Sequence, residues 1–193
     1  MRDAVILYLH GFRSSPGAWK ARLLFAEMAR RGLAGQFLCP PLSPVPDEAV
    51  SDLSRLIESC REVSSHSPTL VGSSLGGHYA NHLAEKYDLR AVLVNPAVVA
   101  RLDADRFVGE HLPFDGGPPF CFTPEHARQL TAQVATPTPE RYWLLLETGD
   151  EALDYREAQD FYFGCRQNVF EGGDHSFTRF PELLPQILEF AGI

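Results

Sequence analysis

The sequence of 193 residues lacks a long hydrophobic run, and no apolar stretch approaches the roughly 20 residues that a membrane-spanning helix requires. The first apolar segment, Ala4 to Leu9, follows Met1-Arg2-Asp3 directly and is too short for a secretion signal with its cleavage site. These absences predict a protein that has no membrane partner and resides in the cytoplasm.

Cysteine and basic residues are also scarce. The four cysteines form no CxxC pair, so the sequence indicates neither a disulfide framework nor a zinc site. We expect buried or half-buried thiols at Cys39, Cys60, Cys121 and Cys165. The 25 acidic residues outnumber the 17 basic ones, which gives a formal net charge of −8. A nucleic-acid partner would require a basic face, so the composition argues against one.

No cofactor signature is present either. The chain has no GxGxxG or Walker-type loop, so we expect no nucleotide or flavin. His78 and His82 share a helix face at the spacing of a metal pair, but the residues between them lack the glutamate of a zinc protease. A structural or surface role is the better interpretation, and we expect no metal.

What the sequence does contain is an alternation of apolar runs with longer segments of helical period. It predicts strands near 4–9, 36–39, 69–72, 91–94, 142–146 and 168–170, and helices near 16–32, 47–64, 75–87 and 182–191. This alternation is typical of an α/β fold in which helices cover both faces of a mostly parallel, six-stranded sheet. The length suits a single domain spanning residues 1–193.

The alternation breaks between residues 101 and 139, a stretch rich in phenylalanine, glycine and proline. Because loops at the carboxyl ends of parallel strands surround the ligand site, this insertion could form a small lid over an active site. The alternative is that its phenylalanines fill a peripheral core. Within it, Thr123-Pro124-Glu125-His126 predicts the start of a helix.

The most informative feature is Gly72-Ser73-Ser74-Leu75-Gly76-Gly77, which follows a predicted strand and precedes a predicted helix. A Gly-x-Ser-x-Gly sequence in this setting is typical of a nucleophile elbow, where the serine occupies a strained turn and a flanking Cβ would collide with backbone. Ser74 is the candidate nucleophile, because Ser73 lacks glycine two residues to either side. A plain connection between strand and helix remains the alternative.

A serine nucleophile needs a base and a carboxylate that orients the base. His175 follows the last predicted strand within a glycine-rich loop and is the candidate base, and Asp150 follows the preceding strand and is the candidate orienting acid. Asp174 and Asp154 are the alternatives for the acid. The order serine, aspartate, histidine is that of α/β-hydrolases.

The oxyanion of an acyl-transfer reaction needs hydrogen-bond donors. We expect the backbone N–H groups of Phe12, in the loop after the first strand, and of Leu75, directly after the nucleophile, to supply them. His10 ends the first strand beside a glycine, and we expect it to brace this loop by hydrogen bonds, with proton transfer as the alternative.

With these residues in place, the chain resembles the YqiA/YcfP-like group of small bacterial α/β-hydrolase esterases over nearly its whole length. The resemblance is carried by the elbow and by five further segments: Tyr8-Leu9-His10-Gly11-Phe12-Arg13-Ser14-Ser15-Pro16, Asn95-Pro96-Ala97, Thr148-Gly149-Asp150-Glu151, Asp154-Tyr155 and Gly172-Gly173-Asp174-His175-Ser176-Phe177. It implies a compact hydrolase without the first antiparallel strands of larger relatives, acting on short-chain esters, with acyl-thioesters as the alternative.

Three functions follow as hypotheses. The first is a cofactor-free serine esterase that hydrolyses short-chain carboxylic esters, small molecules, through an acyl-enzyme. The second is an acyl-CoA thioesterase with the same three residues, for which Arg13, Arg101 and Arg106 could form a positive rim near the site. The third is a ligand-binding protein that keeps the fold without the chemistry.

Overall fold

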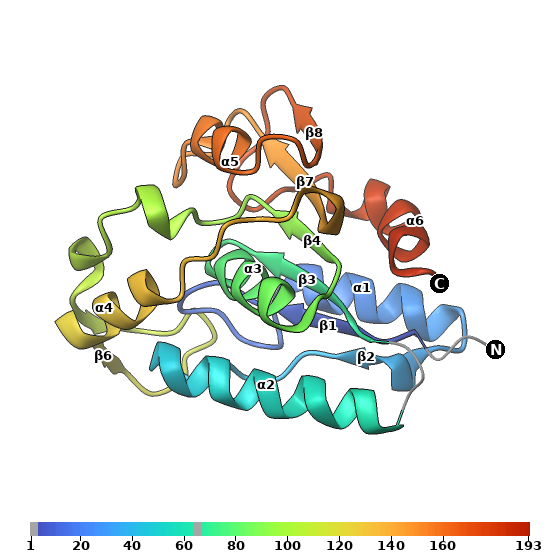
Figure 1. The fold of residues 1–193 in the computed structure, drawn as a ribbon, viewed down its shortest axis with the longest axis horizontal. Coiled ribbons are helices and arrows are strands. Elements are labelled where there is room, and N and C mark those ends of the chain that lie inside the picture. Colours follow the sequence, from blue (N-terminus) through green and yellow to red (C-terminus); the bar gives the residue numbers. More distant parts are fainter. Residues whose placement is uncertain (1–3, 64–66) are drawn as a thin grey trace.

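The computed structural model describes residues 4–63 and 67–193, so Met1-Arg2-Asp3 and the last residue of the helix expected at 47–64 lie outside the described residues. Six parallel strands form one sheet in the order β2-β1-β3-β4-β7-β8 (Figure 1). The strands are β1 (Ile6–Leu9), β2 (Phe37–Leu38), β3 (Thr69–Ser73), β4 (Ala91–Val94), β7 (Tyr142–Glu147) and β8 (Arg166–Phe170). All five strand pairs are parallel, which confirms the predicted sheet.

The register brings the carboxyl ends of the central strands to one edge of the sheet. Leu9 of β1 pairs with Gly72 of β3, and Gly72 pairs in turn with Leu93 of β4. The loops that follow these strands therefore start next to one another, as the sequence pattern predicts for the candidate site residues.

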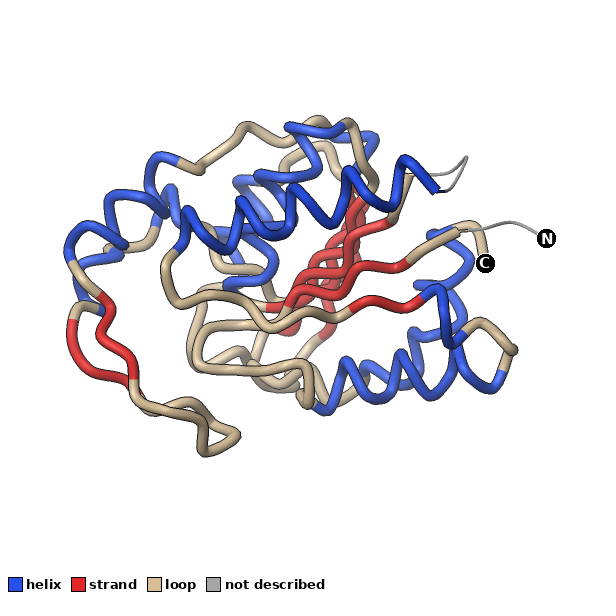
Figure 2. The backbone as a smooth tube through the Cα atoms, turned by 90° about the horizontal axis from the view of Figure 1, so that it is seen from below, coloured by secondary structure: helices blue, strands red, loops and turns tan. Residues whose placement is uncertain are grey.

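Helices cover both faces of the sheet, as expected (Figure 2). On one face lie α2 (Pro46–Val63), α3 (Leu75–Tyr87), α4 (Pro124–Ala132) and α5 (Tyr155–Phe161), and on the other α1 (Trp19–Arg30) and α6 (Phe180–Ala191). Side chains alternate between the two cores along each strand: in β1, Leu7 faces α2 and α3, whereas Tyr8 faces α1. A strand buried on both faces must be apolar throughout, which is why β1 and β4 read as continuous hydrophobic runs.

The insertion between residues 101 and 139 has more structure than its sequence predicts. It contains one short 3₁₀ helix (Ala104–Phe107), a hairpin of β5 (Gly109–His111) and β6 (Phe120–Phe122), and α4. The expected helix start at Thr123 is confirmed, since the Thr123 hydroxyl accepts the His126 N–H at 3.2 Å and the His126 ring accepts the Thr123 N–H. The predicted elements also miss α5, a helix of only seven residues.

Candidate active site

Ser74 lies between β3 and α3 with backbone angles that an L-residue rarely adopts. Its φ is 56° and its ψ is −123°, a conformation that costs free energy and persists only where neighbouring contacts hold it. The Ser74 N–H donates to the Val94 carbonyl at 3.1 Å, and the Ser74 carbonyl accepts from Gly77 and Ala97 at 2.9 and 3.0 Å. These bonds hold the strained turn that the elbow sequence predicts.

The glycines of the elbow are explained by close packing. A Cβ on Gly72 would collide with the Gly76 carbonyl, and a Cβ on Gly76 would collide with the Leu9 carbonyl of β1. A Cβ on Gly77 would lie 2.6 Å from the Pro96 Cβ. The first turn of α3 therefore rests directly on the backbone of the sheet, which positions the serine between the two.

Gly76→Ala is expected to destabilise the protein by about 3 kcal/mol, because β1 and α3 must separate to admit the methyl group. The free energy of unfolding in urea measures the effect. Gly35→Ala is the matched control, since a Cβ at Gly35 meets no atom within 4 Å and its φ is not positive. Equal stability of the two variants would contradict the packing argument.

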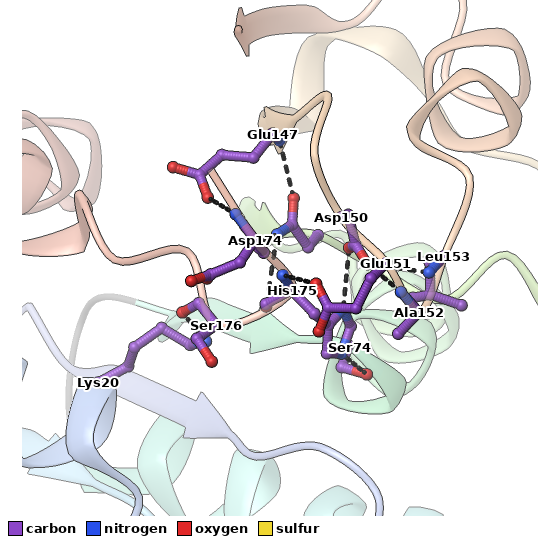
Figure 3. A network of polar contacts seen from close by, with 11 residues as sticks. Lys20, Ser74, Glu147, Asp150, Glu151, Ala152, Leu153, Asp174, His175 and Ser176 are labelled. Atoms are coloured by element: carbon purple, nitrogen blue, oxygen red, sulfur yellow. Dashed lines mark hydrogen bonds and ion pairs between the residues drawn. The ribbon is translucent and has the colours of Figure 1, made fainter. Parts of the chain in front are cut away.

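The structure brings the three predicted residues together (Figure 3). The His175 Nε2 lies 3.0 Å from the Ser74 Oγ, and the His175 Nδ1 lies 2.8 Å from the Asp150 Oδ2. With the proton on Nδ1, the imidazole donates to the carboxylate and its Nε2 accepts from the serine hydroxyl. This is the geometry that serine activation requires.

The Asp150 carboxylate is held in place by its own loop. Its side chain is 2% exposed, and its Oδ1 accepts the N–H groups of Ala152 and Leu153 at 2.8 and 2.9 Å. The alternative Asp154 instead caps α5 and pairs with Arg156. The buried Asp174 Oδ1 has no hydrogen-bond partner among the described residues. The geometry thus favours Asp150 as the acid.

Two residues that sequence reasoning missed, Asn95 and Glu147, fix the loop that carries the histidine. The Asn95 Nδ2 donates to the Asp174 carbonyl at 3.0 Å, and the Asn95 Oδ1 accepts the Glu147 N–H at 3.0 Å. The fully buried Glu147 carboxylate accepts the Asp174 N–H at 2.8 Å and the Arg179 Nε–H at 2.6 Å. A buried carboxylate is stable only with such partners. The sequence signal that could have pointed to Glu147 is a single glutamate at the end of an otherwise apolar strand.

The loop before His175 also requires a glycine, because its backbone passes close to the buried Glu147 carboxylate. Gly173 has a φ of 75°, and a Cβ there would collide with the Glu147 carboxylate. A second contact holds the backbone of His175, whose N–H donates to the Glu151 carboxylate at 3.0 Å. The glycine-rich sequence before His175 is therefore needed for the loop to fold over Glu147.

Lys20 of α1 also contacts the loop that carries His175. Its side chain is largely buried, and its Nζ donates to the Ser176 carbonyl at 2.7 Å (Figure 3). Burial lowers the pKa of Lys20 to about 8, and the carboxylates of Asp174, Asp150 and Glu147 oppose this shift. Sequence patterns gave no indication of this contact, because 156 positions separate the two residues.

The stability of the protein is expected to rise with pH between about 8 and 10.4 through Lys20. In this window the unfolded chain keeps a proton that the folded chain has lost, so the free energy of unfolding increases with pH. Lys20→Met should reduce this rise by about 2 kcal/mol. Urea unfolding of the wild type and Lys20→Met at pH 7.5 and 10 measures this difference. All other titrating groups are common to the two proteins, so their contributions cancel. Parallel pH dependence would contradict the prediction.

Around the predicted oxyanion site, His10 plays the bracing role that the sequence suggested. Its Nδ1 bonds the Gly11 carbonyl at 3.1 Å, and its Nε2 accepts the Leu42 N–H at 3.3 Å. Burial lowers the pKa of His10, which favours the neutral ring that this pattern needs. Both ring nitrogens are thus engaged away from Ser74.

The expected oxyanion donors flank the nucleophile. Leu75 follows Ser74 at the first position of α3, and a Cβ on Gly11, the residue before Phe12, would lie 3.1 Å from the Ser74 Cβ. Neither the Phe12 N–H nor the Leu75 N–H has an acceptor among the described residues. Their role as oxyanion donors stays a prediction.

One expectation needs correction. Cys121 is exposed, because it lies on the outer side of the hairpin strand β6, whereas Cys60 is buried and Cys39 and Cys165 are half-buried. Of the three arginines that could form a positive rim, Arg101 pairs with Asp160 at 2.7 Å and the Arg106 guanidinium lies over the Phe107 ring. Only Arg13 of the three lines the cavity beside the elbow.

The two histidines of α3 differ in their surroundings. His78 is buried, which lowers its pKa to about 4, and the His82 Nδ1 bonds the Gln133 carbonyl at 2.9 Å. Within residues 4–63 and 67–193, no group of three or more histidine, cysteine, aspartate or glutamate side chains is placed to hold a metal ion. In the same part of the chain, no helix is both long and apolar enough to cross a membrane.

A cavity of about 570 Å³ lies beside the elbow. Gly11, Phe12 and Leu75 form its end nearest the nucleophile, and the insertion contributes residues from Pro113 to Phe122. Part of the insertion lines this cavity, and Phe122, Ala127 and Leu130 join the core. Its role as a lid stays a prediction. The volume lies within the range of small-molecule sites.

Similar solved structures have the same fold. One, from work on the metagenome-derived lipolytic enzymes LipS and LipT, has a TM-score of 0.76 and 16% identity, covering 99% of this chain and 94% of that chain. Est1E from Butyrivibrio proteoclasticus with ferulic acid bound has a TM-score of 0.73 and 12% identity, covering 100% and 91%. Alpha/beta hydrolase domain-containing protein 10 from mouse has a TM-score of 0.69 and 18% identity, covering 97% and 89%.

The sequence itself matches a family profile over residues 5–192, nearly its whole length. The family is described as uncharacterised, so it supplies no activity, and the low identities to solved structures establish the fold alone. On these grounds the chain is an α/β-hydrolase fold protein that belongs to the Uncharacterised protein family UPF0227.

Proposed function

We propose that this protein is a cofactor-free serine hydrolase that cleaves carboxylic esters, short-chain esters among them, through an acyl-enzyme. The observation that supports it most is the continuous hydrogen-bonded chain from Ser74 through His175 to Asp150, with distances of 3.0 and 2.8 Å. The strained backbone of Ser74 adds to this support, because strain of this kind persists where function needs it.

In the first half of the proposed reaction, the His175 Nε2 removes the proton of the Ser74 hydroxyl as the Ser74 Oγ attacks the ester carbonyl carbon. The N–H groups of Phe12 and Leu75 donate to the oxyanion of the tetrahedral intermediate. The Asp150 carboxylate keeps the proton on Nδ1 and stabilises the imidazolium. His175 then gives its proton to the departing alcohol, and the C–O bond breaks.

In the second half, water enters on the side that the alcohol has left. The His175 Nε2 takes one of its protons while the oxygen attacks the acyl carbon, and the same imidazolium returns the proton to the Ser74 Oγ as the acid departs. Because the network around the loop is fixed by Asn95 and Glu147, the histidine serves both steps from one position.

The acyl-CoA thioesterase is the weaker candidate. A thiolate leaving group would suit the same three residues, but two of the three arginines that could receive a CoA phosphate are already engaged within the protein: Arg101 pairs with Asp160, and the Arg13 Nε–H donates to the Leu112 carbonyl. The Arg13 guanidinium is itself occupied, lying 4.4 Å from the centre of the Phe114 ring. We therefore place esters ahead of CoA thioesters.

Purified protein tests the proposal with p-nitrophenyl butyrate and butyryl-CoA as matched acyl donors, followed by labelling with a fluorophosphonate. We expect ester turnover that is lost on labelling, with the adduct mapped by mass spectrometry to Ser74. Faster turnover of the CoA thioester would favour the second candidate. A folded protein that neither hydrolyses either donor nor accepts the label would favour a binding function.

A chelator is expected to leave this turnover unchanged. The proton transfers and the oxyanion donors of the proposed mechanism are all supplied by groups of the protein, so no Lewis acid is required. Rates with and without EDTA after overnight dialysis measure this, and restoration of a lost rate by added Zn²⁺ or Mg²⁺ would contradict it.

A further inference from the structure

The cavity beside the elbow has an apolar interior. Its larger side chains come from four separate segments: Phe12, Leu42, Leu75, Tyr79, Phe120 and Phe122. The rings of Phe120 and Phe122 both pack edge-on against Phe12, with centroids 5.6 Å from it. Such a lining favours an apolar ligand group.

The outer wall of the cavity is fastened to the loop after β1. The Arg13 Nε–H donates to the Leu112 carbonyl at 2.7 Å, and the Phe114 N–H donates to the Arg13 carbonyl at 2.8 Å. The Arg13 guanidinium also stacks on the Phe114 ring. These contacts hold the segment from Pro113 to Phe120 beside the elbow, so the cavity is formed before a substrate arrives.

The position of the cavity relative to the histidine is set by the sheet. In the strand order β2-β1-β3-β4-β7-β8, the nucleophile follows the central β3. The cavity is built by loops that follow β1 and β2, together with the hairpin, whereas Asp150 and His175 follow β7 and β8 on the other side. No residue between 147 and 177 lines the cavity. The cavity and the base thus lie on opposite sides of Ser74.

This arrangement distinguishes the two halves of an ester. The departing alcohol must lie next to the His175 Nε2, because it receives its proton from there. With the carbonyl oxygen directed at the N–H groups of Phe12 and Leu75, the remaining substituent of the carbonyl carbon points away from the histidine. On that side lies the cavity.

We propose that the cavity is the acyl subsite, and that the protein acts on esters of apolar carboxylic acids with acyl groups well beyond acetyl, whose alcohols stay outside the cavity. This inference rests on the proposed function and names the half of the substrate that determines its specificity. Leu42, Phe120 and Phe122 are its specificity-determining residues.

Isomeric esters test the proposal, since they differ only in which side of the ester carries the chain. Methyl hexanoate and pentyl acetate have the same atoms, and both release a primary alcohol. Each methylene buried in an apolar site contributes roughly a fourfold gain in affinity. We expect kcat/KM for methyl hexanoate to exceed that for pentyl acetate on the order of 100-fold, measured by titration of the released acid.

Two variants locate the effect in the cavity. Leu42→Trp fills it without removing the backbone bond to His10, and should lower the ratio of kcat/KM for methyl hexanoate to kcat/KM for p-nitrophenyl acetate at least tenfold. Phe120→Ala enlarges it and should raise the preference for methyl octanoate over methyl hexanoate. Phe163→Ala is the matched control, because Phe163 is 85% exposed and does not line the cavity.

The outcomes separate this inference from the function on which it rests. Serine-dependent hydrolysis with equal rates for the two isomers, or with pentyl acetate preferred, would overturn the acyl assignment and keep the esterase. An unchanged chain-length preference in Leu42→Trp would overturn it as well, even if Phe120→Ala fails to fold. No hydrolysis of any ester by the folded wild type would overturn both.

Discussion

Replacing Ser74 with alanine is expected to lower kcat for p-nitrophenyl butyrate on the order of 10⁶-fold. His175→Ala should cost as much, and the double variant should be no slower than either single variant. The reason is that the hydroxyl at 3.0 Å from the imidazole is activated only by that imidazole, so each group is ineffective without the other. Steady-state kinetics of the three variants measure this non-additivity.

The control for this prediction is folding. Neither side chain fills the core: Ser74 is half-buried, and the His175 side chain is 26% exposed. Thermal unfolding of the variants should therefore stay within a few degrees of the wild type. Turnover at wild-type level by a folded Ser74→Ala protein would rule out the proposed mechanism.

Asp150→Asn is expected to lower kcat on the order of 10⁴-fold. The amide is nearly the same size as the carboxylate, so the loop can keep its shape, but an NH₂ facing Nδ1 would favour the tautomer with its proton on Nε2. That tautomer cannot accept the proton of Ser74. The negative charge that stabilises the imidazolium is lost as well.

Asp154→Asn is the matched control for this variant. Asp154 was the alternative acid in the sequence, and it lies four residues further along the same loop, where its carboxylate caps α5. We expect near wild-type kcat from it and at most a small loss of stability, since asparagine also caps helices well. A large loss in Asp154→Asn together with activity in Asp150→Asn would reverse the assignment of the acid.

Much of the candidate site could be predicted because its signals are local. Ser74 is marked by glycines two residues away, and the structure explains them by contacts of Gly72 and Gly76 with neighbouring backbone. Asp150 follows the apolar strand β7 and His175 follows the edge strand β8, and parallel strands bring their carboxyl ends to one edge. Local sequence patterns therefore predicted that Ser74, Asp150 and His175 lie close together, although they are far apart in the sequence.

The sequence by itself determined the six-stranded parallel sheet, the helices on both faces and the positions of the three residues, because hydrophobic periodicity and glycine sterics act over a few neighbours. Only the tertiary structure decided what surrounds them. Three hydrogen bonds support the histidine loop: from Lys20 to Ser176, from Asn95 to Asp174 and from Asp174 to Glu147. They join residues that are 156, 79 and 27 positions apart in the sequence. The cavity is likewise bounded by segments from residue 10 to residue 122, and its shape depends on how their side chains pack together.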